Sequence, residues 1–148
     1  MANLSNSYKS KHFHIVLEEF DRVNNKHISE ADLDNYCKAE MRFSFYAFIK
    51  HDSDRDMDGN LEHIHYHLVV ICNQAYSKNT IINSIASGLL VNIDIVQVRK
   101  NKSFVGSIRY LLHKDDVTKF PYQFQDIWTS DLNEVTKLSQ QNFIRSSE

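Results

Sequence analysis

Alternating apolar and polar positions dominate the first half of the chain and predict β-strands. His12 to Phe20 begins with an apolar run and predicts a first strand. Phe43 to Ile49 is rich in aromatic residues, and its odd-numbered face continues to His51. A strand from about Leu61 to Cys72 is apolar on both faces, which is typical of a central strand covered on both sides.

Helical periodicity and capping residues mark the segments between and after these strands. Ser29 to Glu40 opens with Ser-x-x-Asp, a near capping box. Gly88 is the expected stop of the helix that begins at Ser77. The other expected elements are a strand at Val91 to Val98, a helix at Ser103 to His113, an edge strand within Phe120 to Trp128, and a helix opened by Asp131. The pattern predicts an α+β fold, with a central antiparallel sheet of about five strands and helices packed on its faces.

Length and composition restrict the protein to ordinary soluble classes. We expect 148 residues to form one domain (1–148), with 130–148 as a C-terminal helix or tail. Two cysteines, Cys37 and Cys72, are too few for a disulfide framework, and no signal-peptide or membrane-spanning stretch is apparent. We therefore expect reduced thiols, a cytoplasmic location and no membrane partner. The net charge of −2 does not by itself indicate nucleic-acid binding.

Candidate metal chemistry centres on His65-Tyr66-His67. Two imidazoles separated by one residue share a face of a strand, where they offer two nitrogens to one divalent ion. Antiparallel pairing with the preceding strand brings His51 and Asp54 close, so the four side chains could converge on one ion. Imidazole and carboxylate ligands suit Mn²⁺ or Mg²⁺ and tolerate Zn²⁺ or Co²⁺. His63 is interpreted as a neighbour of this site and not as a ligand. The alternative is that the alternating histidines form only the solvated face of an edge strand and bind no metal.

A candidate nucleophile lies in the helix at Ser103 to His113. Its apolar stripe leaves Tyr110 to one side, beside Gly106, Ser107 and Lys114, where small residues give a large substrate room. A tyrosine beside a core helix is more often a packing residue, and periodicity does not single out Tyr110 among seven tyrosines.

The motifs together resemble the HUH endonucleases of rolling-circle replication, above all the small replication initiator (Rep) proteins of Gram-positive plasmids. They are His-Asp-Ser-Asp, then His-Tyr-His, then Arg-Tyr-Leu-Leu-His-Lys-Asp-Asp, and their order and spacing match from Phe13 to Tyr122. The resemblance implies a ferredoxin-like or RRM-like antiparallel sheet. It also implies Tyr110 as the nucleophile and a Mn²⁺ or Mg²⁺ ion held by His51, Asp54, His65 and His67.

The resemblance further implies the reaction and its partners. Such a protein nicks single-stranded or hairpin origin DNA, forms a 5′-phosphotyrosine and leaves a free 3′-hydroxyl as primer. The host replication helicase and polymerase are expected partners, and a homo-oligomer is a further expectation. We expect the oligomerisation or helicase region of many relatives to be absent or very short after Trp128. Lys114 or the ion could stabilise the phenolate. Expected phosphate contacts are Arg99, Lys100, Lys102 and Arg109, with an ordinary solvated loop as the equally weighted alternative.

Two other functions compete with this interpretation. One is another HUH nuclease: relaxases place the tyrosine before the histidine pair, which disfavours them here, whereas single-strand transposases share the later tyrosine. The other is a non-catalytic DNA-binding or metal-sensing module, in which the histidines are regulatory. A protein-linked DNA fragment formed in the presence of Mn²⁺ would separate the nucleases from such a module.

Overall fold

A five-stranded antiparallel sheet forms the centre of the protein in the computed structural model, which describes residues 9–99, 103–114 and 118–140. The strand order is β6-β1-β5-β4-β7. The strands are β1 (Lys9–Glu18), β4 (Phe43–His51), β5 (His65–Ser77), β6 (Val96–Arg99) and β7 (Trp128–Thr129), and a separate ribbon contains β2 (Phe20–Asp21) and β3 (Lys26–His27). The predicted fold class is confirmed.

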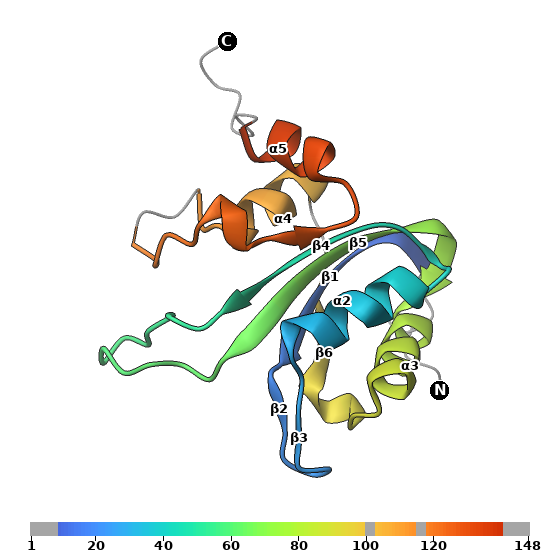
Figure 1. The fold of residues 1–148 in the computed structure, drawn as a ribbon, viewed down its shortest axis with the longest axis horizontal. Coiled ribbons are helices and arrows are strands. Elements are labelled where there is room, and N and C mark those ends of the chain that lie inside the picture. The colour runs from blue at the N-terminus through green and yellow to red at the C-terminus, as the bar shows by residue number, and fades with distance from the viewer. Residues whose placement is uncertain (1–8, 100–102, 115–117, 141–148) are drawn as a thin grey trace.

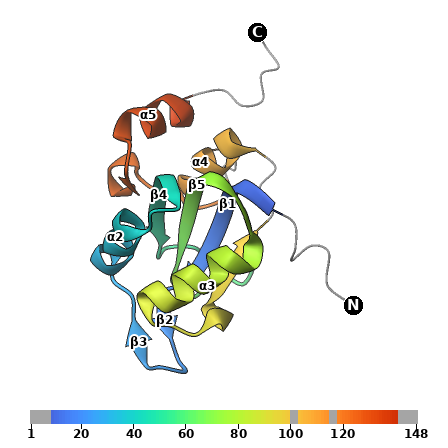
Figure 2. The ribbon, with the colours of Figure 1, turned by 90° about the vertical axis from the view of Figure 1, so that its right-hand side faces the viewer.

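Helices cover both faces of this sheet (Figures 1 and 2). On one face lie α2 (Glu30–Ala39) and α3 (Lys78–Leu89), and on the other lie α4 (Phe104–Leu111) and α5 (Leu132–Gln140). Short 3₁₀ turns occupy Ile93–Ile95 and Phe124–Asp126. Because side chains alternate along a strand, β5 sends Tyr66 and Leu68 into the α2/α3 core and Val69 into the α4/α5 core. The prediction of a central strand covered on both sides is therefore correct.

Strand register brings the histidines together on the α4/α5 face. His51 is directly opposite His65, and Ile49 is opposite His67. On the other side of β5, Val16 of β1 is opposite His67. Residues that face one another in an antiparallel pair point to the same side of the sheet, so these side chains share a surface.

Two helix boundaries show how local sequence sets the structure. Ser29 and Asp32 form the expected capping box at the start of α2. Gly88, however, lies inside α3 and does not end it; Leu90 does so with a left-handed φ of 58°. A Cβ at Gly88 would come within 2.5 Å of the Tyr36 ring, so glycine is needed here for close packing of α3 on α2.

Several predicted strand boundaries are wrong. β5 starts at His65 instead of Leu61, because residues 61–64 belong to the connecting loop, where Leu61 makes an isolated bridge to Arg55. His63 is thus exposed outside the strand. The predicted strand at Val91–Val98 begins with a 3₁₀ turn, and the predicted edge strand shrinks to Trp128–Thr129.

Three further expectations concern the cysteines, membrane-spanning helices and the residues outside the described ranges. Cys37 and Cys72 are buried free thiols, and burial raises the pKa of Cys72 to about 11. Within the described residues, no helix is long and apolar enough to span a bilayer. Lys100, Lys102 and the tail after Gln140 lie outside those residues.

Candidate active site

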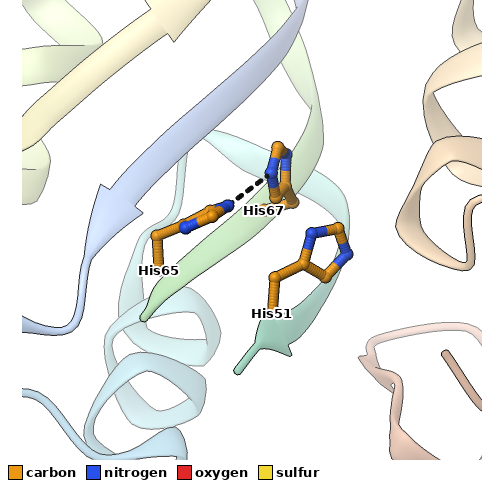
Figure 3. A group of neighbouring side chains, drawn as sticks. All are labelled: His51, His65 and His67. Atoms are coloured by element: carbon orange, nitrogen blue, oxygen red, sulfur yellow. Dashed lines mark hydrogen bonds between the residues drawn. The ribbon is translucent and has the colours of Figure 1, made fainter. Parts of the chain in front are cut away.

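Three imidazoles meet at the ends of β4 and β5, as Figure 3 shows. His65 Nε2 lies 3.1 Å from His67 Nε2, and one nitrogen of each of the three rings falls within 4.8 Å of the others. The ring centroids of His51 and His67 are 4.4 Å apart. His51 and His67 are almost fully buried, and His65 is partly exposed.

Each of these rings uses its other nitrogen in a hydrogen bond. His51 Nε2 is 2.9 Å from the Leu111 carbonyl oxygen, and His65 Nδ1 is 2.8 Å from the His63 carbonyl oxygen. A carbonyl only accepts, so both of these nitrogens carry the hydrogen. His51 Nδ1 and His65 Nε2 are then lone-pair donors that face the cluster.

Asp54 completes the group from the loop after β4. Its Oδ2 lies 3.4 Å from His51 Nδ1 and 3.7 Å from His65 Nε2. The Tyr122 hydroxyl donates a 2.6 Å hydrogen bond to Asp54 Oδ1, and the same hydroxyl accepts one from the Ser53 backbone N–H. Tyr122 also stacks on His51, with centroids 4.2 Å apart and an interplanar angle of 2°. One tyrosine thus positions a carboxylate and an imidazole.

Burial keeps the central imidazoles neutral. It lowers the pKa of His51 to about 4 and that of His67 well below its ordinary value. The pKa of His14 is also lowered to about 4, first by burial and then by the positive charge of Arg99. Neutral imidazoles have the lone pair that a metal ligand requires, so the electrostatics favour cation binding over protonation.

The residues present fit a divalent ion. His51 Nδ1 is buried and makes no hydrogen bond to any described residue, although an unpaired buried polar atom is costly. A bound cation would use this lone pair together with nitrogens of His65 and His67, which group with His51. Asp54 Oδ2, 3.4 Å from His51 Nδ1 and 3.7 Å from His65 Nε2, would complete the set. Three nitrogens and one carboxylate oxygen form a donor set suited to a first-row divalent metal.

Tyr110 of α4 lies against this cluster. Its ring centroid is 5.0 Å from that of His67 and 6.2 Å from that of His51. Lys119 Nζ donates a 3.1 Å hydrogen bond to the Tyr110 hydroxyl and lies 5.0 Å from its ring centroid. The sequence suggested Lys114 beside this hydroxyl; the structure places Lys119 there.

A cleft of about 810 Å³ lies beside this cluster. Asp54, His65, His67 and Tyr110 line it, together with the cationic side chains of Arg55, Arg99 and Lys119. Arg109, an expected phosphate contact, instead donates a 2.8 Å hydrogen bond to the Ser139 carbonyl oxygen on α5. Of the four expected phosphate contacts, Arg99 is the one that lines the cleft among the described residues.

Sequence reasoning missed several side chains of this site. His14 and His12 repeat the i, i+2 spacing of His65 and His67, so the signal for His14 was present in the first strand. His113 follows Tyr110 by three residues; its buried Nε2 makes no hydrogen bond within the described chain and lies near His51 and Asp54. Tyr122 and Lys119 come from an irregular segment whose path no periodicity reveals.

Residues 34–135 match the family described as plasmid replication protein, origin binding domain. The chain belongs to this family. It is 34% identical over 101 residues to a "Replication protein" of Staphylococcus aureus, an alignment that covers 67% of this chain and 47% of that protein. The chain thus spans about half the length of this curated relative. The expected resemblance to plasmid Rep proteins is confirmed, and the origin-binding domain contains His51, Asp54, His65, His67 and Tyr110 within the matched segment.

Proposed function

We propose that this origin-binding domain is a metal-dependent, strand-specific DNA nickase that initiates rolling-circle replication. In this proposal Tyr110 is the nucleophile, and His51, Asp54, His65 and His67 hold a Mn²⁺ or Mg²⁺ ion. Membership in the plasmid replication family supports origin DNA as the substrate, in preference to a transposon end.

The observation that carries the proposal is the shared cleft. Tyr110, Lys119, Asp54, His65 and His67 line it together, and His51 lies in the same imidazole cluster at the ends of β4 and β5. A regulatory metal site has no need of a phenol and an ammonium at this position. The arrangement supports attack on a phosphodiester bound between the histidines and Tyr110.

When bound, a divalent ion supplies Lewis-acid withdrawal of charge from a non-bridging phosphate oxygen. The chain's own residues provide the remaining conditions. Tyr122 and the backbone carbonyls of Leu111 and His63 orient Asp54, His51 and His65. This orientation is set before DNA binds, so little reorganisation is needed during the reaction.

Tyr110 then performs the group transfer. Its hydroxyl loses a proton, its oxygen forms a bond to phosphorus, and the bond from phosphorus to the 3′ oxygen breaks. The 3′ oxygen takes up a proton and becomes a free hydroxyl, and the downstream strand stays attached to Tyr110 through its 5′ phosphate. The Lys119 ammonium, 3.1 Å from the phenol oxygen, stabilises the developing phenolate.

Single-stranded DNA suits the cleft because the scissile phosphate must come close to a half-buried tyrosine. Arg99, Arg55 and Lys119 provide salt-dependent phosphate contacts. The free 3′-hydroxyl would serve a host polymerase, with a helicase opening the duplex ahead of it. Self-association into a homo-oligomer is part of the same proposal.

The test is covalent capture from a random single-stranded DNA pool labelled at the 3′ end, incubated with the protein and Mn²⁺. The 3′ label reports the fragment that stays on the tyrosine. We expect a labelled protein band on a denaturing gel, lost with EDTA and in Tyr110→Phe. Sequencing the captured DNA would identify the origin motif.

Tyr76→Phe is the matched control, since the Tyr76 hydroxyl bonds Asn73 on an exposed surface remote from the cleft. It should form adduct like the wild type. If Tyr110→Phe forms as much covalent adduct as the wild type, the assignment of Tyr110 as the nucleophile is refuted. Sequence-selective DNA binding with no adduct at any Mn²⁺ or Mg²⁺ concentration would favour the non-catalytic module.

A further inference from the structure

His14 of β1 contacts one of the proposed metal ligands directly. Its Nε2 lies 2.8 Å from His67 Nδ1, and both side chains are buried. The register sets this contact: His14 is opposite Val69 and Val16 is opposite His67, so His14 and His67 are diagonal neighbours on one face. Diagonal positions in an antiparallel pair are within reach of aromatic side chains.

On its other side His14 faces the helix that carries Tyr110. His14 Nδ1 lies 3.4 Å from Ser107 Oγ, and Ser107 precedes Tyr110 by three residues on α4. The His14 and Tyr110 rings also meet edge to face, with centroids 5.7 Å apart. His14 therefore lies between the strand that bears the ligand and the helix that bears the nucleophile.

We propose that His14 is a positioning residue that orients His67, keeps a hydrogen bond to it in either tautomer, and aligns α4 with the metal centre. This inference rests on the proposed metal site. If His67 ligates through Nε2, its Nδ1 must carry the ring hydrogen and needs an acceptor. His51 and His65 use backbone carbonyls for this purpose; His67 has the His14 imidazole.

An imidazole at this position serves both tautomers of His67. With His67 Nε2 as a ligand, His14 Nε2 accepts from His67 and His14 Nδ1–H points to Ser107 Oγ. In the other tautomer the hydrogen is on His67 Nε2, which donates to His65 Nε2 at 3.1 Å. His67 Nδ1 then accepts a hydrogen bond from His14 Nε2–H. A backbone carbonyl can only accept, so it would satisfy only the first arrangement. Histidine can accept or donate, so His67 can change tautomer without leaving a buried nitrogen unpaired.

The experiment measures Mn²⁺ affinity of the purified chain by calorimetry, in the absence of DNA. His14→Phe keeps an aromatic ring but removes both nitrogens, and we expect Mn²⁺ to bind about tenfold to a hundredfold more weakly. His14→Gln places an amide near the Nε2 position and should stay within about threefold of the wild type, whereas His14→Asn reaches only the Nδ1 position and should behave like His14→Phe.

His12→Phe is the matched control, because His12 lies on the same strand but is exposed and contacts Phe104. It should bind Mn²⁺ like the wild type. If His14→Phe is not folded by circular dichroism, the Asn and Gln pair gives the answer. Equal Mn²⁺ affinity in the Asn, Gln and wild-type proteins would overturn the inference.

The double variant His65→Ala, His67→Ala separates this inference from the proposed function. If the double variant loses Mn²⁺ binding and the His14 variants keep wild-type affinity, only the role of His14 is rejected and the metal site stands. Wild-type Mn²⁺ affinity in the double variant would reject the metal site itself, and the role of His14 with it.

Discussion

The Tyr122 hydroxyl donates a 2.6 Å hydrogen bond to Asp54 Oδ1, which leaves Oδ2 directed toward His51 and His65. The bond links two segments far apart in the sequence, the loop after β4 and the segment before the Phe124–Asp126 turn. Burial is the main cause of the raised pKa of Tyr122, and the hydrogen bond to the Asp54 carboxylate is the next. Tyr122 therefore remains a neutral donor and fixes which oxygen of Asp54 faces the histidines.

Tyr122→Phe should weaken Mn²⁺ binding about tenfold while retaining the ring that stacks on His51. We also expect a loss of about 2 kcal/mol in the free energy of unfolding, since a hydrogen bond to a charged group is lost. Calorimetry and urea denaturation measure the two effects, with Tyr76→Phe as the control. Unchanged Mn²⁺ affinity would show that Asp54 needs no orientation by Tyr122.

Lys119→Met should slow formation of the covalent adduct more than it weakens DNA binding. The ammonium lies 3.1 Å from the phenol oxygen, where it stabilises the negative charge that develops during attack, so its removal should lower the cleavage rate about tenfold or more. Single-turnover cleavage at saturating protein is the measurement, with DNA affinity measured separately. Lys114→Met is the control, because Lys114 is the lysine that the sequence favoured. A slower rate in the Lys114 variant and not in the Lys119 variant would reverse the assignment.

Acid should destabilise the chain when metal is removed with EDTA. The pKa of His14 is about 4 in the folded chain against 6.5 ordinarily, so between these values the unfolded chain binds a proton that the folded chain does not. The free energy of unfolding should therefore fall as pH drops from 6.5 to about 4, by roughly 3 kcal/mol from His14 alone. Urea denaturation across this range should give a shallower slope for His14→Phe. Identical slopes for the two proteins would contradict the pKa assigned to His14.

Gly88→Ala tests the contact between α2 and α3 away from the cleft. Alanine favours helices, yet its Cβ would come within 2.5 Å of Tyr36 ring atoms. We expect a loss of about 1–3 kcal/mol in the free energy of unfolding, with Mn²⁺ affinity unchanged. Ser87→Ala, on the exposed side of the same helix, is the control. A more stable Gly88→Ala protein would mean that Tyr36 moves aside at little cost.

Alternation along the strands was sufficient to predict the sheet and the approach of His51 to His65. The i, i+2 period places both β5 histidines on one face, and the antiparallel hairpin brings the His51 end of β4 beside them. The same period applies to His12 and His14, but the register of β1 on β5, which no local pattern encodes, was needed to bring His14 to His67.

Irregular segments limited the rest of the prediction. Lys119 and Tyr122 reach the cleft from a connection without periodicity, where the path depends on tertiary contacts such as the bond to Asp54. Lys114 was the nearer candidate in the sequence, but α4 ends at Leu111, and Lys119 is the lysine that bonds the Tyr110 hydroxyl. Gly88 has the sequence features of a helix stop, and only the packing of Tyr36 against it explains its helical position.

The attachment site of DNA tests the central claim most directly. After covalent capture with Mn²⁺, the DNA is trimmed with nuclease, the protein is cut with trypsin, and the nucleotide-bearing peptide is sequenced by mass spectrometry. Trypsin cuts after Arg109 and Lys114, so the peptide Tyr110–Lys114 contains a single tyrosine. The proposal predicts a nucleotide linked through its 5′ phosphate to Tyr110. A nucleotide on another residue, such as Tyr122, would contradict it.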